Sequence, residues 1–405
     1  MTDGLTIGER ITWYRRRRGM SQEVLAGLVG RSTDWLSKVE NDRIAMDRLA
    51  VIRSVADALR IRLGDLLDEP SVQAQSAPAR ASVVESLRDA LTDYRSISPV
   101  LDHGSNGGLI ELDVLDARLR SAWDACQHAH YSVAVHHLPS LLAHSHQAAQ
   151  RHHGDDQLRA YSMLALTHHL AATILARTGE AHLAWIAADR GLTAAQHCGD
   201  PLVIGSLFRS VAHSLLSCGR FTAAQDVTSD AASYLTAARH PASPAFLSVY
   251  GTLLLVGAMA AARDGERAAV QDYMRSSASA AEQLGHDANY LWTAFGPTNV
   301  AIHQVSTAAE LGDVQIALDL GPSIEAAGLP VERQVRHKLE VARAHSARNR
   351  TDDALAIVLA AEQLSPEQVR DHFISRQLVG TWVRTLRGKP SPRLAALAQR
   401  LQLLE

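Results

Sequence analysis

The chain has 405 residues, of which 46% are hydrophobic and 20% are charged, and its formal net charge is −3. This length is sufficient for a small module and a larger one. A charge so close to zero excludes nucleic-acid binding driven by attraction to the whole molecule, so any such affinity must come from local placement of charge.

Several features of the sequence indicate a cytoplasmic protein. The three cysteines, Cys126, Cys198 and Cys218, are odd in number and widely spaced, without the paired spacing of a metal site or a disulfide framework. The polar N-terminus runs directly into a predicted helix, so we expect no secretory leader. We expect the apolar stretches, such as residues 253–262, to be too short and too rich in Ala and Gly to span a membrane.

Two short helices are predicted near the N-terminus. Apolar residues recur at helical spacing over residues 21–29, and Gly30 allows a tight turn after them. Ser32 is a good N-cap for a following helix, whose buried stripe would comprise Trp35, Leu36 and Val39. Two short helices joined by a turn that contains glycine indicate a helix-turn-helix unit.

The residues of this unit also resemble a known family. Eight of them stand in the order and spacing of the xenobiotic-response-element (XRE, Cro/repressor-like) helix-turn-helix family: Gln22, Ala26, Gly30, Ser32, Leu36, Ser37, Val39 and Glu40. The resemblance covers about residues 7–69 and implies a five-helix, lambda-repressor-like domain, with further helices over residues 7–18, 46–59 and 63–67. The chain departs from the family at Asp42, where Gly is common, at Met46, where Pro is common, and at Arg31, where an apolar residue is common.

Such a domain places its second short helix in the DNA major groove. Thr33, Asp34 and Lys38 would face outward and are the candidates for contact with base edges. Alternatively, Asp34 serves only to stabilise the N-terminus of the helix through its negative charge. The predicted DNA-binding residues, including those expected to contact phosphates, are Gln22, Arg31, Ser32, Thr33, Asp34, Ser37, Lys38, Asn41 and Arg43. The four arginines at positions 15–18 allow two interpretations, phosphate contacts or solvated cations that favour a helix C-terminus.

The rest of the chain is predicted to be a second all-α domain. Two prolines and small polar residues indicate a linker over residues 70–82, which separates a domain at 1–69 from one at 83–405. A turn motif followed by alanine recurs at intervals of about 40 residues. It stands at Gly179-Glu180 with Ala184, Gly219-Arg220 with Ala224, Gly312-Asp313 with Ala317, and Asn349-Arg350 with Ala354, and Asp264-Gly265 falls in the same place with Ala269 one residue early. The predicted helix pairs span residues 110–151, 157–198, 201–239, 244–284, 288–327, 331–364 and 367–403. This pattern favours a tetratricopeptide-like α-solenoid over a generic helical bundle.

The combination of the two domains resembles the peptide-responsive regulators called RRNPP, and a class of repeat-bearing regulators from high-GC bacteria that govern secondary metabolism. The segment WTAFGPTNVAIH at residues 292–303 is similar to a repeat of that second class. The first resemblance implies that an effector binds in the concave groove of the array. The effectors of the second class are mostly unassigned.

Several side chains of the array are candidates for contact with an effector. Trp292, Asn299 and His303 are predicted to share one face of a helix that contains Pro297, with Phe295 as a further aromatic wall. The full candidate set is Trp292, Phe295, Asn299, His303, Arg209, His213, Tyr250, Tyr161 and His168. Arg333, Arg336 and His337 would give the groove a positive end suited to an anion. The alternatives are packing between repeats for the aromatic residues and a solvated surface for the charges.

Catalytic and metal-binding patterns find little support. Eight of the 20 histidines crowd into one predicted repeat: His128, His130, His136, His137, His144, His146, His152 and His153. No two of these eight are four residues apart and no HExxH motif occurs, so hydrogen-bonded or solvated histidines are favoured over a zinc site. Phosphate loops, nucleophile elbows and paired acidic motifs are also absent from the sequence, and we expect no cofactor and no enzymatic activity.

These patterns together predict a cytoplasmic, nucleoid-associated transcriptional regulator that binds double-stranded DNA. We expect a homodimer that reads an inverted repeat, because a single small helix-turn-helix makes few contacts. The array would hold the dimer and bind a small-molecule or peptide effector. The alternative is an array that serves as a protein-interaction scaffold without a small ligand.

Overall fold

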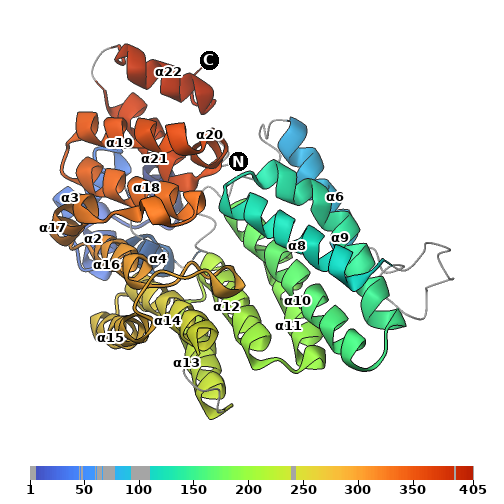
Figure 1. The fold of residues 1–405 in the computed structure, drawn as a ribbon. Helices are drawn as coiled ribbons and strands as arrows, with labels where there is room; N and C mark the ends of the chain where they lie inside the picture. The colour runs from blue at the N-terminus through green and yellow to red at the C-terminus, as the bar shows by residue number, and fades with distance from the viewer. Residues whose placement is uncertain are drawn as a thin grey trace.

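The computed structural model describes residues 6–44, 46, 49–59, 61, 66, 78–92, 110–238, 243–386 and 389–404. Within these ranges the chain forms helices, and its β-structure is limited to one isolated bridge between Ala288 and Phe295. The predicted all-α class is therefore confirmed. Figure 1 shows the helices of the array in an arc that runs from α6–α11 through α12–α16 to α18–α22.

The N-terminal domain contains α1 (Ile7–Arg17), α2 (Gln22–Leu28), α3 (Thr33–Glu40) and α4 (Leu49–Ala58). A capping box of Thr6 and Glu9 begins α1, and the Ser32 hydroxyl accepts a hydrogen bond from the Trp35 amide at the start of α3. Gly30 has φ of +65°, as the predicted turn requires. The core of the domain comprises mainly Ile11, Leu25, Leu36, Val39, Ile52, Val55 and Leu59. Of the predicted fifth helix at 63–67, only Leu66 lies among the described residues, where it is helical and buried.

The array begins with α6 (Pro78–Thr92), which starts five residues before the predicted position of Val83. The helix pairs are α8 (Leu112–Gln127) with α9 (Tyr131–Arg151), α10 (Gly154–Arg177) with α11 (Ala181–Cys198), α12 (Pro201–Ser217) with α13 (Phe221–Ala237), α14 (Pro244–Asp264) with α15 (Arg267–Leu284), α16 (Pro297–Leu311) with α17 (Val314–Leu320), and α18 (Val331–Ala347) with α19 (Thr351–Leu364). The short 3-10 helices η1 (Tyr290–Trp292), η2 (Gly321–Ser323) and η3 (Ala326–Gly328) lie between them.

The predicted hairpin turns are confirmed at residue level. Gly179, Gly219, Gly312 and Asn349 all have positive φ, between +59° and +87°, which lets the chain leave one helix and enter the next. The alanines that follow these turns are fully buried, so they permit close approach of the paired helices. The last predicted pair, at 367–403, is wrong in detail, because this segment forms three helices, α20 (Pro366–Asp371), α21 (Phe373–Thr385) and α22 (Pro392–Arg400).

The central helix α14 corrects one expectation from the sequence. It has 21 residues and is long and apolar enough, by length and composition, to cross a membrane, whereas we expected no such stretch. However, 83% of its most apolar window is buried inside the protein, where it packs against α12, α13, α15 and α16. The composition of α14 is thus that of a core helix in the array.

The N-terminal domain packs on the array through α4 and the segment before it. Arg53 on α4 forms an ion pair with Asp264 at the end of α14, with 2.8 Å between its Nη1 and the carboxylate Oδ1. The Gln377 side chain of α21 donates a hydrogen bond to the Met46 carbonyl, at 3.2 Å. These contacts leave the N-terminus of α3 uncovered, since Thr33 and Asp34 are exposed.

Candidate functional sites

A buried charge network holds α3 in place. The Arg15 guanidinium at the end of α1 donates two hydrogen bonds to the Glu40 carboxylate at the end of α3, at 2.5 and 2.7 Å. The Gln22 amide of α2 donates a third, at 2.8 Å. Burial alone would raise the pKa of Glu40, but the hydrogen bonds from Arg15 and Gln22 outweigh it and hold this pKa below its ordinary value. The network therefore joins three helices through one carboxylate.

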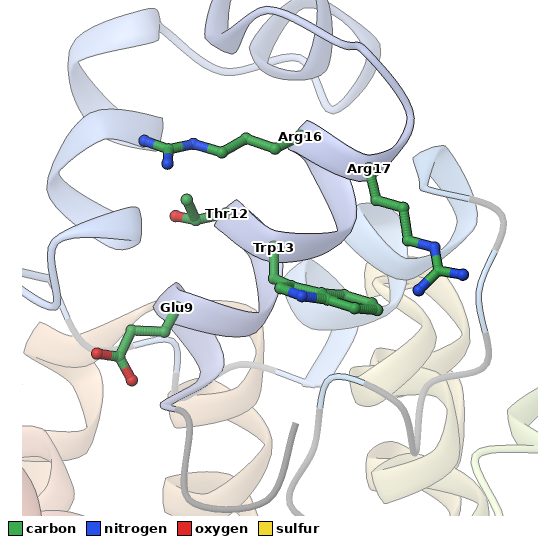
Figure 2. Close-up of a pocket in the computed structure, with 5 residues that line it drawn as sticks. All are labelled: Glu9, Thr12, Trp13, Arg16 and Arg17. Atoms are coloured by element: carbon green, nitrogen blue, oxygen red, sulfur yellow. The ribbon is translucent and has the colours of Figure 1, made fainter. Parts of the chain in front are cut away.

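The arginines at positions 15–18 lie in different environments, because only Arg15 belongs to this network. Arg15 is buried and paired, so it is neither a phosphate ligand nor a solvated cation. Arg16 and Arg17 are exposed, and Figure 2 shows them beside Glu9, Thr12 and Trp13 around a shallow pocket on the outer face of α1. The guanidinium of Arg17 lies 4.9 Å from the centre of the Trp13 ring, a cation–π distance.

The outward face of α3 carries polar side chains, as predicted. Thr33, Asp34 and Lys38 are exposed, as are Arg31, Ser32, Asn41 and Arg43. The Lys38 ammonium lies 2.7 Å from the Asp34 carboxylate, one helical turn away. Both side chains are largely in water, so this pair is worth little and can exchange for other partners. Ser37 is half-buried, and its carbonyl accepts a hydrogen bond from the Asn41 amide that covers the end of the helix.

The prediction that Trp292, Asn299 and His303 share one helical face is wrong. Helix α16 begins at Pro297, so Trp292 lies outside it, in η1, with φ of +55°. Its ring stacks on that of Trp123 in α8, with 4.8 Å between ring centres. The Phe295 ring is fully buried against the backbone of Gly251 in α14, where a Cβ would come within 1.9 Å of it. Phe295 is a core residue.

Asn299 and His303 do share a face of α16, and both are buried. The His303 Nδ1 lies 2.9 Å from the Asn299 carbonyl. In the described ranges, neither the oxygen nor the nitrogen of the Asn299 side-chain amide has a hydrogen-bond partner. Burial, followed by the positive charge of Arg333, lowers the pKa of His303 to about 3. This imidazole is therefore neutral at physiological pH.

Arg209 and His213 on α12 contribute to the same region. The Arg209 Nη2 lies 3.2 Å from the His169 Nε2, and burial together with Arg333 and Arg177 lowers the pKa of Arg209 to about 9. Burial and the neighbouring arginines, Arg209 first among them, also lower the pKa of His213. The fold thus brings together side chains of α12, α16 and α18 that the sequence analysis placed on separate repeats.

Four other candidates have partners elsewhere. Tyr161 stacks on His197 with 4.9 Å between ring centres, and Tyr250 stacks on Phe246 at 5.5 Å. The His168 Nε2 lies 3.3 Å from the His146 Nε2. His337, predicted beside Arg333 and Arg336, has its Nε2 at 3.0 Å from the Gly321 carbonyl.

Sequence reasoning missed two members of this region, Arg177 and Glu332. The Arg177 Nη2 at the end of α10 lies 3.2 Å from the Glu332 Oε1 at the start of α18, and Arg333 lies 3.8 Å from the other oxygen of the same carboxylate. Burial would raise the pKa of Glu332, but Arg177 and Arg333 outweigh it and lower that pKa to about 2. In the sequence Arg177 has the pattern of an ordinary cation at a helix C-terminus, and Glu332 that of an acid in a first turn.

The histidine-rich segment gives no sign of a metal site in the part of the chain that the structure describes. There, no three His, Cys, Asp or Glu side chains converge as metal ligands would. Most of the eight histidines lie on the exposed or half-buried sides of α9 and its flanking turns.

The fold and these sites define a two-part protein, a helix-turn-helix domain followed by an array of helical hairpins. Comparison with family models identifies residues 6–69 as a helix-turn-helix domain. No curated protein sequence matches the chain.

The similar solved structures include two at low identity. Aspartyl phosphate phosphatase F from Bacillus subtilis is 12% identical, with 93% of this chain and 96% of that chain covered and a TM-score of 0.46. PlcR from Bacillus thuringiensis, solved in complex with a peptide and DNA, is 10% identical, with 89% and 99% covered and a TM-score of 0.31.

Proposed function

We propose that this protein is a transcriptional regulator that binds double-stranded DNA through α3, as a homodimer, and that an effector bound by the array modulates this binding. The observation that carries the proposal is the exposed polar face of α3. Thr33, Asp34 and Lys38 project from a helix whose opposite face, Leu36 and Val39, is fully buried in a capped helix-turn-helix core.

The buried network beneath α3 supports the same proposal. A recognition helix must hold its side chains in a fixed register against base edges, and Glu40 anchors the end of this helix to α1 and α2. The exposed Arg31 and Arg43 flank the helix at its two ends. There they can contact phosphates on either side of the groove, which would set the position of the domain on the duplex.

A homodimer would place two copies of α3 about one helical turn apart on DNA, roughly 34 Å. The contacts of α4 with the array then give an effector a route to DNA binding. A ligand that favours one arrangement of the array shifts the spacing of the two helices only to the extent that it binds that arrangement better.

Selection of bound sequences from random duplex DNA with the intact protein tests the proposal. We expect an inverted repeat in the selected pool. Lys38→Ala should cost about 1–3 kcal/mol of binding and relax the preference at one base position in each half-site. Arg43→Ala should weaken binding evenly across sequences and reduce its salt dependence.

Lys389→Ala, at an exposed position far along the chain from α3, is the matched control and should leave affinity and specificity unchanged. Absence of binding to any duplex at low ionic strength would refute the DNA-binding proposal. A single undivided half-site in the selected pool would refute the dimer.

A further inference from the structure

Four arginines from three helices of the array act electrostatically on a single carboxylate, and two of them, Arg177 and Arg333, lie within 4 Å of it. They are Arg177 on α10, Arg209 on α12, and Arg333 and Arg336 on α18, and the carboxylate is Glu332. The same four charges act on His213, and Arg333 and Arg336 act on His303, which places all these groups in one region of the array. Arg209, Arg333 and His303 are buried there, whereas Arg336 and His213 are half-buried and Arg177 is exposed. We call Arg209, Arg333, Arg336 and Asn299 the interior basic cluster.

Positive charge in this region exceeds the negative charge available to balance it. Glu332 is engaged by Arg177 and Arg333. Among the described residues, neither Arg209 nor Arg336 has a carboxylate within 4 Å. The other buried carboxylates of α16 and α18, Glu310 and Glu340, are paired with Arg343. A buried guanidinium without an anion is costly, and Arg209 is such a group, whereas Arg336 is half-buried. The buried charge of Arg209 therefore calls for a counter-charge.

Unpaired polar atoms lie in the same region. Asn299 is completely buried, and both its Oδ1 and its Nδ2 lack a hydrogen-bond partner among the residues that the structure describes. The Nε atoms of Arg209 and Arg333 are also buried and lack hydrogen bonds within the described part of the chain. Asn299 lies one turn before His303 on the same face of α16, so it faces the region in which Arg333 and Arg336 act on that imidazole. Each unmet buried donor or acceptor costs about 1–3 kcal/mol, so its presence in a folded protein calls for an explanation, of which a bound group that meets it is one.

We propose that the interior basic cluster is the binding site of an organic anion. A carboxylate or phosphate group of the ligand would face Arg209 and Arg336, and the Asn299 amide would donate to and accept from a neutral polar group of the same ligand. The neutral imidazoles of His213 and His303 would line the site without adding charge. This assignment rests on the proposed effector-binding role of the array and names the chemical class of the effector.

Calorimetric titration of the intact protein without DNA tests the assignment, with inorganic phosphate and citrate as separate probes in a chloride buffer. We expect saturable binding of at least one probe and a matching rise in melting temperature. Stronger binding of phosphate would indicate a phosphorylated effector, and stronger binding of citrate a carboxylate. The double variant Arg209→Gln with Arg336→Gln should weaken the binding at least tenfold. Arg275→Gln, which alters an exposed arginine paired with Asp272, is the matched control and should not weaken it.

Asn299→Asp provides a second variant that adds a charge to the site without changing its size. It should raise the melting temperature in the absence of probe and abolish the response to both anions, because its carboxylate takes the place of the ligand. No saturable response of the unmodified protein, or an equal response in both variants and in the control, would overturn the assignment. Because this titration contains no DNA, its outcome is independent of whether α3 binds a duplex.

Discussion

Two glycines of the helix-turn-helix domain should respond in opposite ways to the same substitution. A Cβ at Gly8 on α1 would come within 2.2 Å of the Val39 carbonyl oxygen and 2.8 Å of the Asp42 carboxylate. The carbonyl belongs to α3 and cannot move without the helix, so we expect Gly8→Ala to destabilise the domain by about 1–3 kcal/mol. A Cβ at Gly27 on α2 would meet no described atom within 4 Å, so Gly27→Ala should stabilise the domain by about 0.5–1 kcal/mol.

Hydrogen exchange of the intact protein measures both effects within one domain. With about 1.4 kcal/mol per factor of ten, Gly8→Ala should reduce protection of the α1 and α3 amides roughly 5- to 150-fold. By the same conversion, Gly27→Ala should raise the protection of these amides about two- to fivefold. Amides of α10 should be unchanged in both variants, which provides the internal control. Equal protection of α3 in the two variants would refute the close approach of α1 to α3.

Three further outcomes follow from the buried groups. Because the pKa of Glu40 is lower in the folded state than its ordinary value, its stabilising effect is present above pH 4.5 and is lost as the pH falls through the folded value. Glu40→Gln should therefore reduce the loss of stability at acidic pH, as measured by denaturant titrations at several pH values. Between pH 6.5 and about 3 the unfolded chain binds a proton at His303 that the folded chain does not, so stability should fall with decreasing pH, and His303→Gln should reduce the slope by up to about 1.4 kcal/mol per pH unit. Trp292→Ala removes the stacking on Trp123, worth about 0.5–1.5 kcal/mol beyond buried area, and should abolish a near-UV circular dichroism signal that Trp185→Ala, at an exposed position, leaves intact.

The local elements of this fold were predictable because their signals lie within a few residues of each other. Ser32 accepts from an amide three residues later, and Gly30 adopts the positive φ that its turn requires. The turns at Gly179 and Gly312, with the fully buried alanines after them, follow from the same short-range logic. Helical spacing, caps and turn residues act through neighbours in the chain, and the sequence displays those neighbours directly.

The error at Trp292 shows where such reasoning fails. A proline between Trp292 and Asn299 fits either a bent helix or the first turn of a new one, and Pro297 occupies the first turn. Periodicity cannot separate these cases, because the residues before Pro297 have the same spacing in both. The packing of Phe295 against Gly251, 44 positions earlier in the chain, is part of what separates them.

By itself, the sequence determined most of the helix pairs, the hairpin turns at Gly179, Gly219, Gly312 and Asn349, and the polar face that α3 presents to solvent. Only the tertiary structure decided which charges are paired: Arg15 belongs to Glu40, and Arg177 meets Glu332 across the array. The physical reason is that a guanidinium has the same local preferences whether it ends in water or beside a distant carboxylate. Its partner is chosen by burial, which depends on residues far away in the chain.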